Sequence, residues 1–135
     1  MKLALVGDWP PPHGGVSVHV AALAAALRAR GDDVRVLDIG RGDHEGDGVV
    51  RARGPARYAA ALARVAAERR LVHVHTSGAS AKSWLVALGA GRARLPGAPR
   101  PLLTLHSGLA PAWLRGGRER RELARAACAG FGGVV

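Results

Sequence analysis

Residues 8–31 read DWPPPHGGVSVHVAALAAALRARG, and this stretch decides the fold class. A short apolar segment, Lys2 to Gly7, precedes it, and an alternating segment, Asp33 to Ile39, follows it. Apolar side chains recur within it at helical spacing, and Gly31 stands where a helix ends on a left-handed residue, so we expect a helix over 16–30. A strand, a tight loop, a helix and a second strand in this order are typical of a parallel α/β sheet.

The same alternation continues to the end of the chain. We therefore expect one domain over 1–135, α/β in class, with a Rossmann-like parallel sheet and helices on both faces. The expected strands lie at 2–7, 33–39, 49–50, 71–75, 102–106 and 132–135; the expected helices lie at 16–30, from 55 onward, at 81–90 and at 117–129. Because the last segment begins a strand that nothing covers, we expect the N-terminal half of a larger protein.

Composition narrows the class of protein. The chain has 135 residues, 48% of them hydrophobic, and its single cysteine, Cys128, allows no internal disulfide, which fits a reducing compartment. Its apolar stretches are too short for a signal peptide or a membrane span, so we expect a cytoplasmic location. The formal net charge of +10 favours anionic partners, although an ordinary solvated basic surface would carry the same charge.

Three loops of the chain, 8–15, 75–80 and 106–109, follow strands directly. In open parallel sheets, ligands bind at the carboxyl ends of the strands, where these loops would gather. Gly14 and Gly15 precede a helix whose unpaired N–H groups attract anions, while a rigid turn without a ligand is the alternative. The spacing matches neither the dinucleotide fingerprint nor the NTPase phosphate loop, since Ser17-Val18-His19 stands where that loop needs its lysine and hydroxyl.

Histidines recur at the same strand ends. His73 and His75 alternate along one strand and share a face, and His13 and His106 lie at neighbouring strand ends. A metal site can be drawn from this set, but a covered sheet would bury His73 and no acidic or thiol ligand joins the set, so we expect no metal. His106, beside Ser107, could hydrogen-bond a substrate hydroxyl or a developing charge, or be satisfied by backbone instead.

Four segments, taken together, resemble a known family. They are PPHGGVSVHVAALAAALRARGDDVRVL at 11–37, LVHVHTSG at 71–78, LLTLHSG at 102–108 and GGVV at 132–135. In their order and spacing they resemble the N-terminal domain of retaining GT-B glycosyltransferases of the GT4 type. The resemblance spans nearly the whole chain, although none of the four segments is decisive by itself.

The resemblance implies an acceptor-binding domain that faces a second domain, absent from this sequence, which binds a nucleotide-sugar donor. It implies no metal and no other cofactor. By this resemblance His106 is the catalytic residue near the transferred sugar, and the loop of Gly14, Gly15 and Val16 approaches the donor diphosphate. The acceptor cleft would include His13, His75, Ser77 and Ser107. Because the donor domain and its carboxylates are absent, we expect this chain alone to transfer no sugar.

A basic α/β module for anionic lipid or another anionic ligand is the main alternative. The segment 111–131 combines the apolar Trp113, Leu114 and Phe131 with a patch of arginines, Arg115, Arg118, Arg121 and Arg125, a mixture suited to an anionic membrane surface. The two functions are compatible, because many transferases of this type modify lipid-linked acceptors, so the inner membrane face is also open as a location. Half of a sugar-nucleotide epimerase is a third alternative. No nucleic-acid motif is present, and we expect no nucleic acid partner.

Overall fold

The computed structural model describes residues 1–44 and 46–135. Over these residues the chain forms a six-stranded parallel sheet in the order β3-β2-β1-β4-β5-β6, which confirms the expected Rossmann-like fold class. The strands are β1 (Lys2–Gly7), β2 (Asp33–Asp38), β3 (Val49–Arg51), β4 (Leu71–Thr76), β5 (Leu102–Leu105) and β6 (Gly133–Val134). The helices are α1 (Gly15–Ala29), α2 (Pro55–Ala67), α3 (Ala81–Arg92), α4 (Ala110–Leu114) and α5 (Arg118–Cys128).

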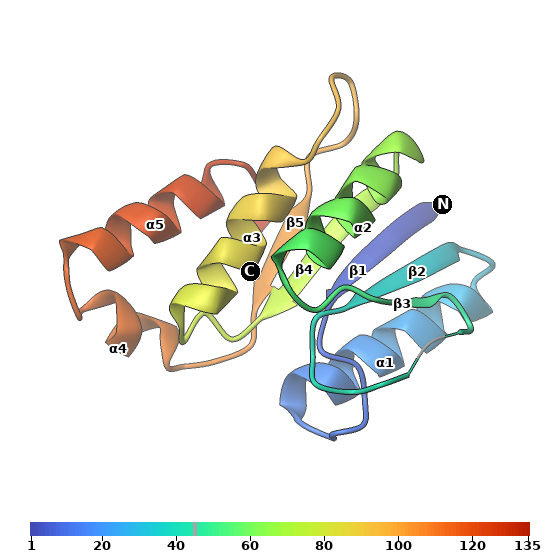
Figure 1. Ribbon diagram of the computed structural model, residues 1–135, viewed down its shortest axis with the longest axis horizontal. Helices are drawn as coiled ribbons and strands as arrows, with labels where there is room; N and C mark the ends of the chain where they lie inside the picture. Colours follow the sequence, from blue (N-terminus) through green and yellow to red (C-terminus); the bar gives the residue numbers. More distant parts are fainter. Residues whose placement is uncertain (45) are drawn as a thin grey trace.

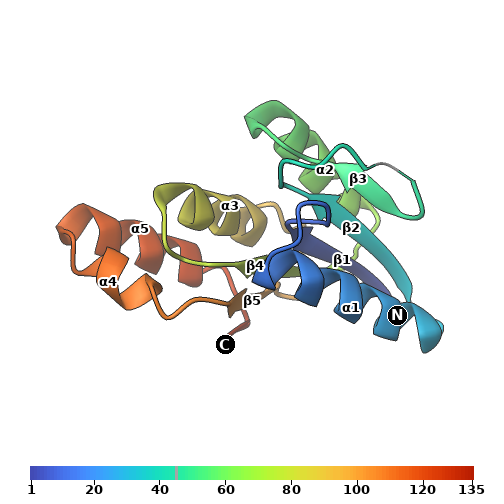
Figure 2. The ribbon, with the colours of Figure 1, turned by 90° about the horizontal axis from the view of Figure 1, so that it is seen from below.

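Helices cover both faces of the sheet, but unequally. Figure 2 shows α1 on one side and α2, α3 and α5 on the other. On the first side, Val20 of α1 packs with Leu5 and Val36 of the strands. On the second side, Trp84 of α3 and Leu103 of β5 belong to a larger buried cluster. Within the described residues α1 is the only helix on its face of the sheet, where it contacts β1, β2 and β4, while α2 and α3 lie in front of the sheet in Figure 1.

The loop between β1 and α1 is held at both ends by side chains. The buried Asp38 accepts hydrogen bonds from the amide nitrogens of Trp9 at 3.0 Å and Gly40 at 2.8 Å, which ties the start of the loop to the end of β2. The hydroxyl of Ser17 accepts a hydrogen bond from the amide of Gly14 at 2.8 Å and lies 3.0 Å from the carbonyl oxygen of Pro12. These bonds fix the amino end of α1 at the carboxyl edge of the sheet.

Local sequence signals predict the end of α1 and the start of α2, but they do not predict the short helix α4. Gly31 ends α1 with φ of +85°, as its position predicts, and Pro55 occupies the first turn of α2. The sequence does not predict the five-residue helix α4, which has Pro111 in its first turn, because so short a helix has too few apolar positions to show a helical period. Within the described residues, no helix combines the length and apolar character needed to cross a membrane.

Candidate functional site

Two adjoining hollows open at the carboxyl edge of the sheet. We call the first the glycine hollow: it has a volume of 420 Å³ and is lined by 8–9, 12–17, 40–41 and Lys82. The second, the serine hollow, has a volume of 210 Å³ and is lined by residues of the segments that follow β1, β2 and β4, among them Ser77 and Ser80. The hollows share Asp8, Val16 and Lys82 as lining residues, so a ligand at this edge can reach both.

Nothing in the described fold requires glycine at the floor of the glycine hollow. Gly14 adopts an ordinary extended conformation with φ of −147°, and the backbone of Gly15 also lies outside the left-handed region. A Cβ atom built on Gly15 would meet no described atom within 4 Å, and one on Gly14 would lie 4.0 Å from the Ser17 hydroxyl. The absence of side chains here leaves room for a group that approaches from outside the fold.

Charged side chains of both signs line the glycine hollow: Lys82 and Arg41 are positive and Asp8 is negative. Lys82 stands in the first turn of α3, and its Nζ donates a hydrogen bond to the carbonyl oxygen of Ile39 at 3.2 Å. The amino ends of α1 and α3 both lie at this edge, and each adds a partial positive charge. Lys82 was not among the residues expected here. The signal was available, because the first turn of a helix that follows a parallel strand lies at the carboxyl edge.

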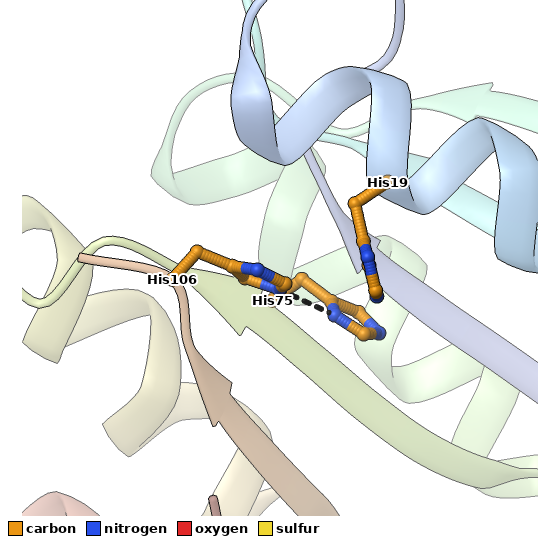
Figure 3. A group of neighbouring side chains, drawn as sticks. All are labelled: His19, His75 and His106. Carbon is orange, nitrogen blue, oxygen red and sulfur yellow. Dashed lines mark hydrogen bonds between the residues drawn. The ribbon is translucent and has the colours of Figure 1, made fainter.

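Three histidines from distant parts of the chain meet beside the serine hollow (Figure 3). His75 is the next-to-last residue of β4, His106 directly follows β5, and the side chain of His19 extends from α1 toward them. The Nδ1 of His75 lies 3.0 Å from the Nε2 of His106, within hydrogen-bond distance. One ring nitrogen from each of the three residues lies within 4.8 Å of those of the other two. We call this group the histidine cluster.

Burial controls the charge of the cluster. Burial, followed by the nearby rings of His73, His106 and His19, lowers the pKa of His75 to about 3. Burial also lowers the pKa of His73 and of His106. The Nε2 of His75 is buried and has no hydrogen-bond partner among the described residues. His75 is therefore a neutral imidazole at pH 7 with an unused polar atom, an arrangement that buried groups usually avoid.

The residues expected from sequence fall into two neighbouring places. His13, Gly14, Gly15 and Val16 line the glycine hollow, whereas His75 and Ser77 line the serine hollow.

The described lining of these hollows does not include His106 or Ser107. The hydroxyl of Ser107 accepts a hydrogen bond from the amide of Leu109 at 3.0 Å, which is a local turn. His106 still lies on the same face of the sheet as α1, because its ring centroid is 4.6 Å from that of His19.

His19 is the residue that sequence reasoning missed. The signal was its position, three residues after Val16 and four before Leu23, which places it along the apolar stripe of α1.

Of the apolar side chains expected beside the arginine patch of 115–125, Phe131 is buried, and Trp113 and Leu114 are partly buried. Phe131 is buried, with 6% of its surface exposed. Trp113 stacks on Trp84 with ring centroids 6.1 Å apart, and the guanidinium of Arg120 covers it at 5.3 Å. Exposed on this side are the arginines expected there, Arg115, Arg118, Arg121 and Arg125. Phe131 is therefore not available to a membrane surface, whereas Trp113 is partly exposed, and binding of the arginines to an anionic surface stays a prediction.

The chain was also compared with known proteins. No family model, curated protein or solved structure matches it.

Proposed function

We propose that the carboxyl edge of this domain binds the phosphates of a sugar nucleotide, and that the domain is the acceptor-binding half of a glycosyltransferase. The observation that carries the proposal is the bare floor of the glycine hollow. The backbone conformations of Gly14 and Gly15 do not require glycine. Because neither residue carries a side chain, the amino end of α1 is left uncovered opposite Lys82. Backbone N–H groups, a helix dipole and an ammonium group together suit a diphosphate.

The neighbouring side chains suit the remainder of such a substrate. The serine hollow adjoins the glycine hollow through Val16 and Lys82, and hydroxyl-bearing side chains line it. Serine hydroxyls both donate and accept hydrogen bonds, as do the hydroxyl groups of a sugar. His106 lies within hydrogen-bond distance of His75. Burial lowers the pKa of His106, so its imidazole is neutral at pH 7. In this proposal His106 contacts the transferred sugar, and a second domain holds the donor's base and sugar.

A binding measurement on this chain tests the proposal. The amide resonances of the isotopically labelled protein are followed while UDP-glucose, GDP-mannose or inorganic pyrophosphate is added at millimolar concentrations. We expect shifts at 14–17 and at Lys82, because their N–H groups lie at the amino ends of α1 and α3. The variant Gly15→Val should weaken binding at least about tenfold, because its side chain fills space that the diphosphate needs.

A matched variant separates this effect from damage to the helix. Ala25 is exposed on the same helix, away from the hollow, so Ala25→Val adds the same side chain without touching the proposed site. We expect it to bind pyrophosphate as the wild type does. Equal binding by Gly15→Val and the wild type, or shifts confined to other loops, would remove the glycine hollow from the site.

A further inference from the structure

The histidine cluster contains one hydrogen bond, between Nδ1 of His75 and Nε2 of His106, and the buried Nε2 of His75 has no partner among the described residues. His19, His75 and His106 come from a helix and from the ends of two neighbouring strands (Figure 3). Their rings are tilted relative to one another, with centroid separations of 4.6, 5.2 and 5.4 Å. His75 is 1% exposed, and its Nε2 has no partner among the described residues. A buried imidazole with an unused nitrogen indicates an unfilled binding position.

From this geometry we propose that His19, His75 and His106 form a binding site for a divalent transition-metal ion such as Zn²⁺. Three imidazoles leave a fourth position open, as in zinc sites that hold a water molecule or a substrate atom. The group contains nitrogen donors only, so it suits Zn²⁺, Co²⁺, Ni²⁺ or Cu²⁺ and does not suit Mg²⁺ or Ca²⁺, which prefer oxygen.

The distances agree with a site that closes around an ion. Zinc–nitrogen bonds of about 2.0–2.1 Å in tetrahedral geometry place two ligand nitrogens about 3.3 Å apart. One ring nitrogen from each of the three histidines lies within 4.8 Å of those of the other two, and the 3.0 Å contact between Nδ1 of His75 and Nε2 of His106 is a hydrogen bond that an ion bound to these two atoms would replace. His19 is exposed on α1, so its side chain can turn toward the two strand histidines without displacing the core.

Neighbouring side chains brace the strand half of the site. The ring of His73 lies 4.0 Å from that of His75, and its Nε2 is 2.9 Å from the hydroxyl oxygen of Thr104 on the adjacent strand. Such packing fixes the orientation of a ligand ring before an ion arrives. The site does not rest on the proposed sugar-nucleotide function, because Gly14, Gly15 and Lys82 take no part in it. An ion on His106 would occupy the ring that the sugar is proposed to contact, so the two ligands would exclude each other.

The experiment measures metal binding by the full chain after dialysis against a chelator. Calorimetry should show one Zn²⁺ ion bound per chain, and Co²⁺ should give the visible absorption of a tetrahedral, nitrogen-bound ion, whereas Mg²⁺ should give no heat. His19→Ala and His106→Ala should each weaken Zn²⁺ binding by at least about tenfold, the lower end of the loss seen when even an outer partner of a ligand is removed.

Two controls keep the result interpretable. His44 is exposed and outside the cluster, so His44→Ala should bind Zn²⁺ as the wild type does. His19→Ala should retain the wild-type circular dichroism spectrum, because alanine favours a helix and His19 is exposed. The proposal is overturned if the wild type binds no Zn²⁺, or if either His19→Ala or His106→Ala binds it with unchanged affinity. Pyrophosphate binding at the glycine hollow is measured separately, so either proposal can fail alone.

Discussion

His75 shows how one buried side chain ties the candidate site to stability. Burial and its histidine neighbours hold the pKa of His75 at about 3, against 6.5 for an ordinary histidine. Below pH 6.5 the unfolded chain therefore binds a proton at His75, whereas the folded chain binds this proton only when the pH falls to about 3. Above pH 6.5 His75 is neutral in both states and does not lower the free energy of unfolding. Between pH 6.5 and about 3, the free energy of unfolding decreases as the pH falls.

We expect the free energy of unfolding to fall as the pH is lowered through this range, measured by urea denaturation in the presence of a chelator. The variant His75→Gln should show a shallower fall, because one of the protons taken up on unfolding is removed. His13→Gln should keep the full slope, since His13 is exposed. An equal slope for His75→Gln and the wild type would contradict the assignment of this pH dependence to His75.

The histidines show which side-chain contacts the sequence predicts and which it does not. The alternation of His73 and His75 predicts a shared face, and the structure confirms it with ring centroids 4.0 Å apart. The meeting of His75 with His19 could not be read from spacing alone. It depends on how α1 crosses the sheet, and crossing is set by the packing of Val20 with Leu5 and Val36. Periodicity gives the face of a helix, whereas the partner across that face comes from three-dimensional packing.

At the scale of elements, the order of the strands and of the helices other than α4 was predictable because each of them carries its own local signal. Alternation marks β2, an apolar stripe marks α1, and glycine or proline marks the ends of the helices. Contact between α3 and the end of α5 had no such signal. There Gly130 approaches Gly91 so closely that a Cβ atom on Gly130 would lie 2.7 Å from the Cα of Gly91.

We expect Gly130→Ala to destabilise the protein by about 1–3 kcal/mol, because the added methyl group forces the end of α5 away from α3. Urea denaturation measures the change. Gly108→Ala is the matched control: a Cβ atom there meets no described atom within 4 Å, so a change of no more than about 0.5 kcal/mol is expected. Equal stability of the two variants would show that the two segments can separate without cost.

At the scale of the whole molecule, the parallel sheet places the residues of the candidate site at its carboxyl edge, and that edge is open. The loops after β1, β4 and β5 converge there, as the parallel topology predicted. The two hollows at this edge, which are lined by the segments after β1, β2 and β4, measure 420 and 210 Å³. Sites that enclose a small molecule occupy about 300–1,000 Å³ and bury most of its surface. The larger hollow is therefore near the lower end of that range, and a sugar nucleotide lying in it would keep its base in water.

The whole chain should therefore fold as an α/β domain and bind common UDP- and GDP-sugars only in the millimolar range, with no sugar transfer. The glycine hollow offers N–H groups and Lys82 to a diphosphate, but contacts exposed to water are weak, since water screens each charge. Calorimetry measures the affinity, and a coupled assay for released nucleoside diphosphate measures transfer. Pyrophosphate at the same millimolar affinity is the matched control, because the proposed contacts reach only the phosphates. Sub-micromolar binding of a nucleotide sugar would mean that this domain holds a complete donor site, and the division of labour between two domains would have to be abandoned.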